Sequence, residues 1–233
     1  MFGTTRKVNH DAFDGLSREA LYWCGILASD GCVYNSRGRA VVAYSSVDVE
    51  HVLKFKAFLG AEHRVIIKEA HGFANGRPQA VLSFTSWKIV AFLISHGIVP
   101  NKSLTLQVSD ILASSSDFWR GMIDGDGSIH PVGGVTLGSG SLGLLQQYVD
   151  FFCSKFPGAG APKIKVRLGD KNPMYSVTLS RFPGRELLKI LYAETGAVSL
   201  DRKRLIVEEL IRGPQVRKSN RTLIFLPPRE NLG

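Results

Sequence analysis

Two aspartates, Asp30 and Asp126, occupy the same place in two similar stretches, one in each half of the chain. The stretches are 23–31 (WCGILASDG) and 119–127 (WRGMIDGDG), and a gapless alignment gives them Trp, Gly, Asp and Gly in common. A lone Asp-Gly pair more often marks only a turn. Repetition of the whole nine-residue pattern favours a chemical role for the two carboxylates.

The chemistry that two such carboxylates suit is the binding of a divalent cation. Each stretch is typical of the last turns of an apolar helix that a glycine ends. An aspartate at a helix C-terminus is disfavoured by about 0.3–1 kcal/mol, and a second carboxylate nearby adds repulsion. A divalent cation relieves both effects, and Mg²⁺ prefers one or two carboxylates together with water and phosphate oxygens. We therefore expect Asp30 and Asp126 to be metal ligands.

Small residues at helical spacing predict how the two aspartates are brought together. Gly25 and Ser29 are four residues apart in the first stretch, as are Gly121 and Gly125 in the second. Residues at this spacing share a helix face, and small side chains let two helix backbones approach closely. We expect the two helices to pack face to face and to end side by side.

At these residues the chain resembles the LAGLIDADG homing endonucleases, in their single-chain form with two motifs. The first stretch has Ala28 where the motif has its first aspartate, and it keeps Asp30 at the catalytic position. The resemblance implies a monomer whose two halves mimic a homodimer, and it covers the chain to about residue 212. The residues of the second stretch that match the motif are Gly121, Ile123, Asp124, Asp126 and Gly127.

The resemblance also implies further residues of the site. The backbone carbonyls of Ser29 and Gly125 would join the aspartates as metal ligands. Basic residues near the metal organise water and stabilise charge in this family, and the segments that close the two halves, 97–103 and 196–203, place Lys102 and Lys203 equivalently. Arg202 or Arg204 is the alternative to Lys203. We interpret Asp124 as a capping group rather than a third ligand.

Charge and cysteine usage narrow the class of partner and the compartment. The 233 residues carry a formal net charge of +9, which favours a polyanionic partner, nucleic acid before membrane. The three cysteines form no CxxC pair, so we expect a reducing compartment and neither a disulfide framework nor a zinc site. The sequence shows no signal peptide and no apolar run that would span a membrane, so we expect an intracellular protein of the cytoplasm or an organelle matrix.

Hydrophobic periodicity and turn residues predict the same order of elements in both halves. We expect an α+β fold of two pseudo-symmetric αββαββα halves, each a curved antiparallel four-stranded sheet covered by helices on one face, joined at the two motif helices. The predicted helices are 16–30, 48–60 and 87–96, then one ending at 126, 142–156 and 185–193. We expect Ser17 and Asp48 to cap the first two of them. The predicted strands are 33–36, 39–46, 63–70 and 77–85, then a hairpin over 128–139, 162–168 and 174–180. The predicted boundaries are 1–103 for the first half, 104–116 for a linker, 117–212 for the second half and 213–233 for an extended or disordered tail.

Alternation along the strands predicts a polar, cationic sheet face. In 163–168, three cations alternate with three aliphatic residues, so the cations share one side of the strand. Most such faces are merely solvated, but this one is short of acids and occurs in both halves. Because a major groove admits a two-stranded ribbon, we expect these faces to bind DNA. The residues predicted to contact DNA are Arg37, Arg39, Ser45, Arg64, Lys68, Arg77, Gln79, Ser83, Thr85, Lys163, Lys165, Arg167, Lys171, Ser176, Thr178 and Ser180.

Taken together, these patterns favour a site-specific double-stranded DNA endonuclease that hydrolyses phosphodiesters with Mg²⁺ and uses Asp30, Asp126, Lys102 and Lys203. The alternative is a nucleic-acid-binding protein of the same fold that does not cleave, such as a splicing maturase or a DNA-binding regulator. A Mg²⁺ enzyme for small molecules lacks support, because the sequence has no phosphate-binding loop. The histidines show no metal-ligand spacing, and Trp23 and Trp119 are expected in the core.

Overall fold

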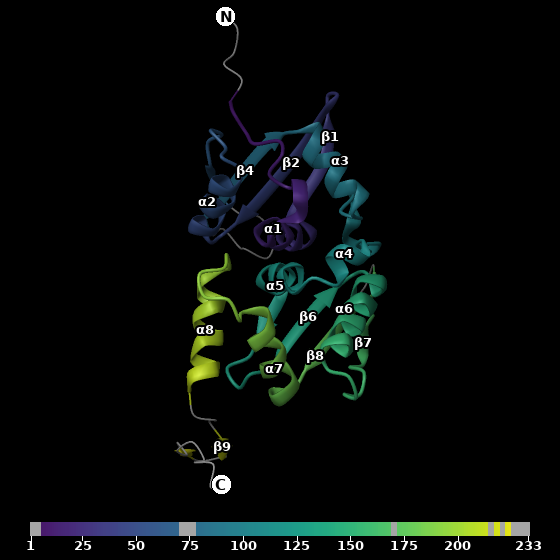
Figure 1. Cartoon of the computed structure of the whole chain (residues 1–233), viewed down its shortest axis with the longest axis vertical. Coiled ribbons are helices and arrows are strands. Elements are labelled where there is room, and N and C mark those ends of the chain that lie inside the picture. Colours follow the sequence, from purple (N-terminus) through teal and green to yellow (C-terminus); the bar gives the residue numbers. More distant parts are fainter. Residues whose placement is uncertain (1–5, 70–77, 169–171, 214–216, 220–221, 225–233) are drawn as a thin grey trace, which may run out of the picture.

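The computed structural model describes residues 6–69, 78–168, 172–213, 217–219 and 222–224, and it consists of two similar halves on either side of a central helix pair (Figure 1). The first half contains η1 (Asp14–Leu16), α1 (Arg18–Ser29), β1 (Gly31–Ser36), β2 (Arg39–Ser46), α2 (Val49–Phe58), β3 (Ile66–Glu69), β4 (Pro78–Thr85) and α3 (Trp87–Ser95), and η3 (Lys102–Leu104) and α4 (Asp110–Ala113) follow it. The second half contains α5 (Ser116–Gly125), β5 (Gly127–Ile129), β6 (Val135–Ser139), α6 (Leu142–Lys155), β7 (Ile164–Arg167), β8 (Met174–Leu179), α7 (Arg181–Leu191) and α8 (Asp201–Arg212).

Each half is built around a four-stranded antiparallel sheet with the same strand order. The orders are β1-β2-β4-β3 and β5-β6-β8-β7, which confirms the predicted α+β fold of two pseudo-symmetric halves. Helices α2 and α3 pack against the first sheet, and α6 and α7 pack against the second. Apolar residues of the strands face these helices because alternate side chains point to opposite sides of a strand. Among the described residues, no helix packs on the other side of either sheet, which we call its free face (Figure 1).

Serine side chains cap the N-termini of several helices. The hydroxyl of Ser17 accepts the backbone N–H of Ala20 at 3.1 Å, as predicted for the start of α1. Equivalent caps begin α3, α5 and α6, where a serine oxygen takes an N–H that has no partner inside the helix. Asp48 stands at the corresponding position of α2, but its side chain makes no capping bond and pairs with Arg202 instead. The expectation that Asp48 caps this helix is therefore wrong.

The two motif tryptophans lie in the core, as expected. Trp23 and Trp119 are both fully buried. Trp23 packs on Phe55, with 4.8 Å between the ring centroids, and Trp119 packs on Tyr148 at 5.1 Å. Each tryptophan thus joins its motif helix to the helix that covers the sheet of its own half, and neither is available to stack on a ligand.

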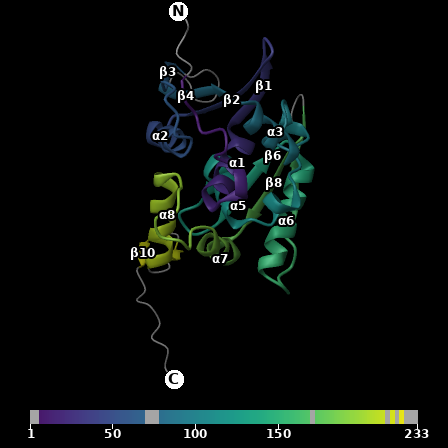
Figure 2. The same cartoon turned by 45° about the horizontal axis from the view of Figure 1, so that its top comes forward.

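Helices α1 and α5 pack against each other at backbone distance, in the middle of the molecule (Figures 1 and 2). A Cβ atom added to Gly25 would lie 2.2 Å from the carbonyl oxygen of Phe118. Glycine is thus required where the helices cross, because any side chain would collide with the backbone of the other helix. The predicted stripe of small residues is the interface of the two halves.

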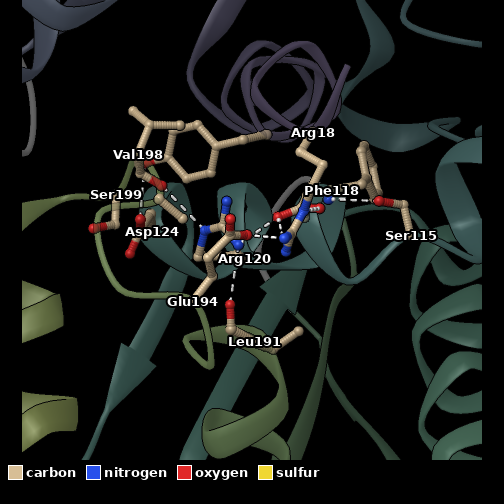
Figure 3. Close-up of polar contacts among 12 residues, drawn as sticks. Arg18, Ser115, Phe118, Arg120, Asp124, Leu191, Glu194, Val198 and Ser199 are labelled. Atoms are coloured by element: carbon tan, nitrogen blue, oxygen red, sulfur yellow. Dashed lines mark hydrogen bonds and ion pairs between the residues drawn. The ribbon is translucent and has the colours of Figure 1, made fainter. Parts of the chain in front are cut away.

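Ion pairs and hydrogen bonds beside this crossing also join the two halves. Arg18 at the start of α1 pairs with Asp117 at 2.9 Å and also with Glu194 (Figure 3). The buried Arg120 of α5 also pairs with Asp117, and it donates to backbone carbonyls near the end of α7 and just before α8. Because these contacts link α1, α5 and the segment before α8, they hold the helix pair in one arrangement.

Several predicted boundaries differ from the structure. Helix α7 begins at Arg181, four residues before the predicted start, because Pro183 is tolerated in a first helical turn. Helix α8 was not predicted, and its start lies beside α2, where Lys54 pairs with Asp201 at 2.5 Å. The stretch predicted as a linker includes α4 and the buried Leu112. In the predicted tail, β9 (Arg217–Ser219) pairs antiparallel with β10 (Thr222–Ile224).

Within the described ranges, no helix combines the length and the apolar character that a bilayer span requires. The three cysteines are free thiols, and Cys24 is buried.

Candidate active site

Asp30 and Asp126 occupy the same position at the ends of the two packed helices. Each is the C-cap residue of its helix, and their backbone angles are nearly equal, with φ and ψ of −97° and −9° for Asp30 and of −90° and −8° for Asp126. A Cβ atom added to Gly125 would lie 2.7 Å from Oδ2 of Asp30, so the first carboxylate leans over the last turn of α5. The close packing of the helices therefore brings the two aspartates together.

The negative charges of Asp30 and Asp126 are both disfavoured in this environment. Although solvent reaches both carboxylates, surrounding protein atoms desolvate them in part. This desolvation raises the pKa of Asp30 to about 6, and the charge of Asp126 contributes, while Lys203 and Lys102 oppose the shift. The same desolvation raises the pKa of Asp126 above its usual value, again opposed by the two lysines. The four predicted residues thus form one cluster in which each charge acts on the others.

Two buried lysines stand behind the carboxylates, each bonded to the glycine that follows its aspartate. Nζ of Lys102 donates to the carbonyl oxygen of Gly31 at 2.5 Å, and Nζ of Lys203 donates to that of Gly127 at 2.6 Å. Burial lowers the pKa of Lys102, and it lowers the pKa of Lys203 to about 8. Lys203 therefore lies at the position equivalent to Lys102.

Neither alternative to Lys203 has this position. The guanidinium of Arg202 pairs with Asp48 of α2 at 3.1 Å. The guanidinium of Arg204 donates to Ser199 and to carbonyls of the segment before α8. Both arginines are used to fix α8 to its surroundings.

The side chain of Asp124 does not point to the cluster. Its carboxylate is buried and accepts hydrogen bonds from the hydroxyls of Tyr22 and Tyr192, at 2.8 and 2.5 Å, and from the backbone N–H of Leu200 at 2.8 Å. Burial raises its pKa, and these hydrogen bonds counteract the shift in part. These three donors come from α1, from the end of α7 and from the start of α8, so Asp124 fastens the two halves and the start of α8.

The donor set fits a small hard cation. Two carboxylates that repel each other would be relieved by a divalent ion, and carboxylate oxygens are the ligands that Mg²⁺ prefers. In the part of the chain that the structure describes, no three His, Cys, Asp or Glu side chains group as metal ligands. Backbone carbonyls, water and phosphate oxygens would therefore complete the coordination, as is usual for Mg²⁺. The hydroxyl of Ser29 is within hydrogen-bond distance of the carbonyl oxygens of Gly25 and Ile26 in its own helix.

The free sheet faces begin next to the carboxylates. Cys32 and Ser128, each two residues after an aspartate, are exposed. Val33, the next residue along β1 after Cys32, is buried and points to the opposite side of the sheet. The register then fixes which predicted side chains share each face, because residues directly opposite on paired strands point the same way. Predicted DNA-contacting residues on the free faces are Lys68, Gln79, Ser83, Thr85, Arg39 and Ser45 in the first half, and Lys165, Arg167, Ser176 and Thr178 in the second.

The remaining predicted contacts lie at the margins of these faces. Arg37 is in the turn between β1 and β2, with a left-handed φ of 50°. Arg64, Lys163 and Ser180 lie just outside the strands, and Ser180 stands at the N-cap of α7. Arg77 and Lys171 fall outside the described residues.

The structure adds face residues that the prediction omitted. A depression of about 620 Å³ on the first sheet is lined by Tyr34 and His63 together with several predicted residues. On the second sheet, Thr136 and Thr178 share a hydrogen bond of 3.0 Å, and His130 bonds to Thr136. Strand alternation alone would have identified Tyr34 and Thr136. The two histidines lie outside regular strands and carry no such signal.

One histidine, His51, has a structural role in the core. Its ring is buried, with Nε2 bonded to the hydroxyl of Tyr22 at 2.7 Å and Nδ1 to that of Tyr44 at 2.6 Å. Since Tyr22 also donates to Asp124, His51 begins a buried polar chain that crosses from the first half to the second. The residues of this chain are far apart in sequence and show no pattern there.

Comparisons with known proteins agree with the two-half architecture. No protein-family model matches the sequence, and no curated protein matches it. Among solved structures, the homing endonuclease I-WcaI bound to its DNA recognition sequence is similar over 82% of this chain and 85% of its own, with a TM-score of 0.55 and 8% identity. I-DmoI in complex with DNA and Ca is similar over 86% of this chain and 99% of its own, with a TM-score of 0.55 and 12% identity.

A third similar structure comes from a differently named protein. Full-length DUF199/WhiA from Thermatoga maritima is similar over 87% of this chain and 64% of its own, with a TM-score of 0.50 and 12% identity. At these identities the likeness establishes the fold. The chain therefore has the two-half fold of the homing endonucleases.

Proposed function

We propose that this protein is a site-specific, metal-dependent endonuclease for double-stranded DNA, of the two-motif LAGLIDADG kind. The observation that carries the proposal is the cluster of Asp30, Asp126, Lys102 and Lys203 at the shared end of α1 and α5, where the two free sheet faces begin. The fold of DNA-bound homing endonucleases and the net charge of +9 support the same function.

In this proposal the two free faces bind the DNA duplex, and the carboxylates of Asp30 and Asp126 lie next to the sugar–phosphate backbone at the centre of the bound site. Side chains such as Lys165, Arg167 and Arg39 would contact phosphates and base edges on either side. One carboxylate from each half would then serve one strand of the duplex. Because each half contributes one motif helix and the two helices already cover each other, the protein would act as a monomer.

Asp30 and Asp126 would hold a divalent cation, together with the backbone oxygens of Ser29 and Gly125. When bound, such an ion lowers the pKa of water and offsets the charge that develops on the phosphate. The contributions of the chain itself are positional and electrostatic. The aspartates are fixed by the helix ends, and the two lysines place positive charge behind them, where a phosphodiester gains negative charge during hydrolysis.

The second candidate is a nucleic-acid-binding protein of the same fold that does not cleave, such as a maturase or a regulator. The likeness to WhiA, which is not named as an endonuclease, supports keeping this alternative. Both motif aspartates are present in this chain, and this favours cleavage.

One experiment separates the two candidates. The purified protein is incubated with a library of randomised duplexes, and with DNA that flanks its own gene, in Mg²⁺ or in EDTA, and new DNA ends are sequenced. We expect ends at a defined site in Mg²⁺ and none in EDTA, while the duplexes retained in EDTA contain the same site. The double variant Asp30→Asn, Asp126→Asn controls for a contaminating nuclease. Retention of a defined site without cleavage in Mg²⁺ would overturn the endonuclease proposal and favour the second candidate.

A further inference from the structure

The two lysines of the cluster differ in how many of their hydrogen-bond donors are used. An ammonium group has three N–H donors. Nζ of Lys203 donates to the carbonyl oxygens of Ile123 at 2.6 Å, Asp124 at 2.7 Å and Gly127 at 2.6 Å, so all three donors are taken. Nζ of Lys102 has one acceptor among the described residues, the carbonyl oxygen of Gly31. Two of its donors are therefore uncommitted.

The acceptors of Lys203 show what its three bonds achieve. Ile123 and Asp124 belong to the last turn of α5, whose carbonyls lack full partners inside the helix and carry partial negative charge. An ammonium held against them caps the helix end. Lys203 therefore closes the turn from which Asp126 projects.

The contact between α5 and α8 is reciprocal. While Lys203, in the first turn of α8, caps the end of α5, the carboxylate of Asp124 near the end of α5 accepts the N–H of Leu200 at the start of α8. Each charge has the sign that favours the helix end it meets. The first half has Ala28 at the position that corresponds to Asp124, so it has no carboxylate there to make the equivalent hydrogen bond.

We infer that the two lysines have different roles in this protein. Lys203 is a positioning residue that fixes the last turn of α5 and hence Asp126. Lys102 is the lysine that donates to a phosphate oxygen or to water, because it keeps free donors beside the two carboxylates. The part of this inference that concerns catalysis rests on the proposed endonuclease function, whereas the assignment of Lys203 as a helix cap stands on geometry alone.

The first test needs neither metal nor DNA. Proton–nitrogen NMR of the lysine ammonium groups measures how fast their hydrogens exchange with water, and the variants Lys102→Met and Lys203→Met assign the two signals. We expect slow exchange for Lys203 and faster exchange for Lys102. In addition, Lys203→Met is expected to lose amide protection over residues 123–126, whereas Lys102→Met keeps it. Equal exchange of the two ammonium groups, or equal loss of protection in the two variants, would overturn the inference.

The second test uses cleavage of a target found by the library selection, at a temperature where each variant is fully folded. We expect Lys102→Met to lower the cleavage rate about 100-fold or more, the range that a positioned proton donor contributes. We expect a smaller loss for Lys203→Met, and a loss that Lys203→Arg does not restore, because a planar guanidinium does not reproduce three converging bonds. Equal losses in the two Met variants would contradict the division of roles. If the wild-type protein cleaves no DNA, the proposed function fails, and the NMR result still decides the assignment of both lysines.

Discussion

Gly25 and Gly121 face each other across the crossing of α1 and α5, each within reach of the backbone of the opposite helix. A Cβ atom on Gly121 would lie 2.2 Å from the carbonyl oxygen of Tyr22 and 3.0 Å from the Cα atom of Gly25. The position of both aspartates depends on this contact, because each follows its glycine by five residues on the same helix. The crossing therefore sets the geometry of the candidate active site.

Replacing Gly121 with alanine is expected to destabilise the protein. Helix propensity alone favours alanine over glycine by about 1 kcal/mol, but overpacking against a rigid backbone costs about 1–3 kcal/mol or more. We therefore expect a net loss in the free energy of unfolding, measured by denaturant titration with circular dichroism. Gly160→Ala is the matched control, because the added methyl group there meets nothing within 4 Å. A gain in stability for Gly121→Ala would show that the helices do not cross here.

Asn substitution at Asp30 or Asp126 is expected to abolish efficient cleavage and to leave binding intact. The change keeps the size of the side chain and removes the charge that attracts the metal. Because a metal ion supplies several kcal/mol to such reactions, and each 1.4 kcal/mol is tenfold, the rate should fall by about 10³-fold or more. Strand-specific labelling of the target shows whether a single substitution leaves a nick or prevents both cuts. Double-strand cleavage by the double variant at the wild-type rate would exclude these carboxylates from catalysis.

Charge reversal on the second sheet is expected to weaken DNA binding and its dependence on salt. Each lost phosphate contact should reduce the slope of log K against log salt by about 0.9. The triple variant Lys163→Glu, Lys165→Glu, Arg167→Glu is measured by fluorescence anisotropy over a range of salt concentrations in EDTA. Lys155→Glu is the control, because this exposed lysine lies at the end of α6, away from the free face. An unchanged slope in the triple variant would show that DNA does not bind to the free face of the second sheet.

Acid is expected to destabilise the protein through His51. Burial, with a contribution from nearby Lys54, lowers the pKa of His51 to about 4 from its ordinary value of 6.5. Between these values the unfolded chain binds a proton and the folded protein does not, so stability falls as the pH drops from about 6.5 to about 4. The loss amounts to about 3 kcal/mol at 1.36 kcal/mol per pKa unit.

The variant His51→Gln isolates this effect. It is expected to be less stable at pH 7, because it loses a hydrogen bond to Tyr22 or Tyr44. Its free energy of unfolding should nevertheless depend less steeply on pH between 6.5 and 4 than that of the wild type. Parallel pH profiles for the two proteins would show that His51 does not titrate in this range.

Local patterns in the sequence determined most of the elements and the faces of the strands, although they missed α8. The stripe of Gly25, Ser29, Gly121 and Gly125 predicts the helix crossing, since small residues on one helix face let two helix backbones approach closely. Alternation in 163–168 predicts which side of β7 carries the cations, because the period of a strand is two residues. Each of these features depends only on residues a few positions apart. Repetition of the motif pattern in the two halves was the further signal that identified both aspartates.

Contacts between distant segments were decided only by the tertiary structure. Sequence placed Lys102 and Lys203 equivalently, but three carbonyls converge on one ammonium and a single carbonyl meets the other, because α8 begins against the end of α5. The chain from Tyr44 through His51 and Tyr22 to Asp124 likewise joins groups of four different elements. Hydrogen bonds form wherever folding places a donor beside an acceptor, and residues tens of positions apart leave no periodic trace of such a meeting.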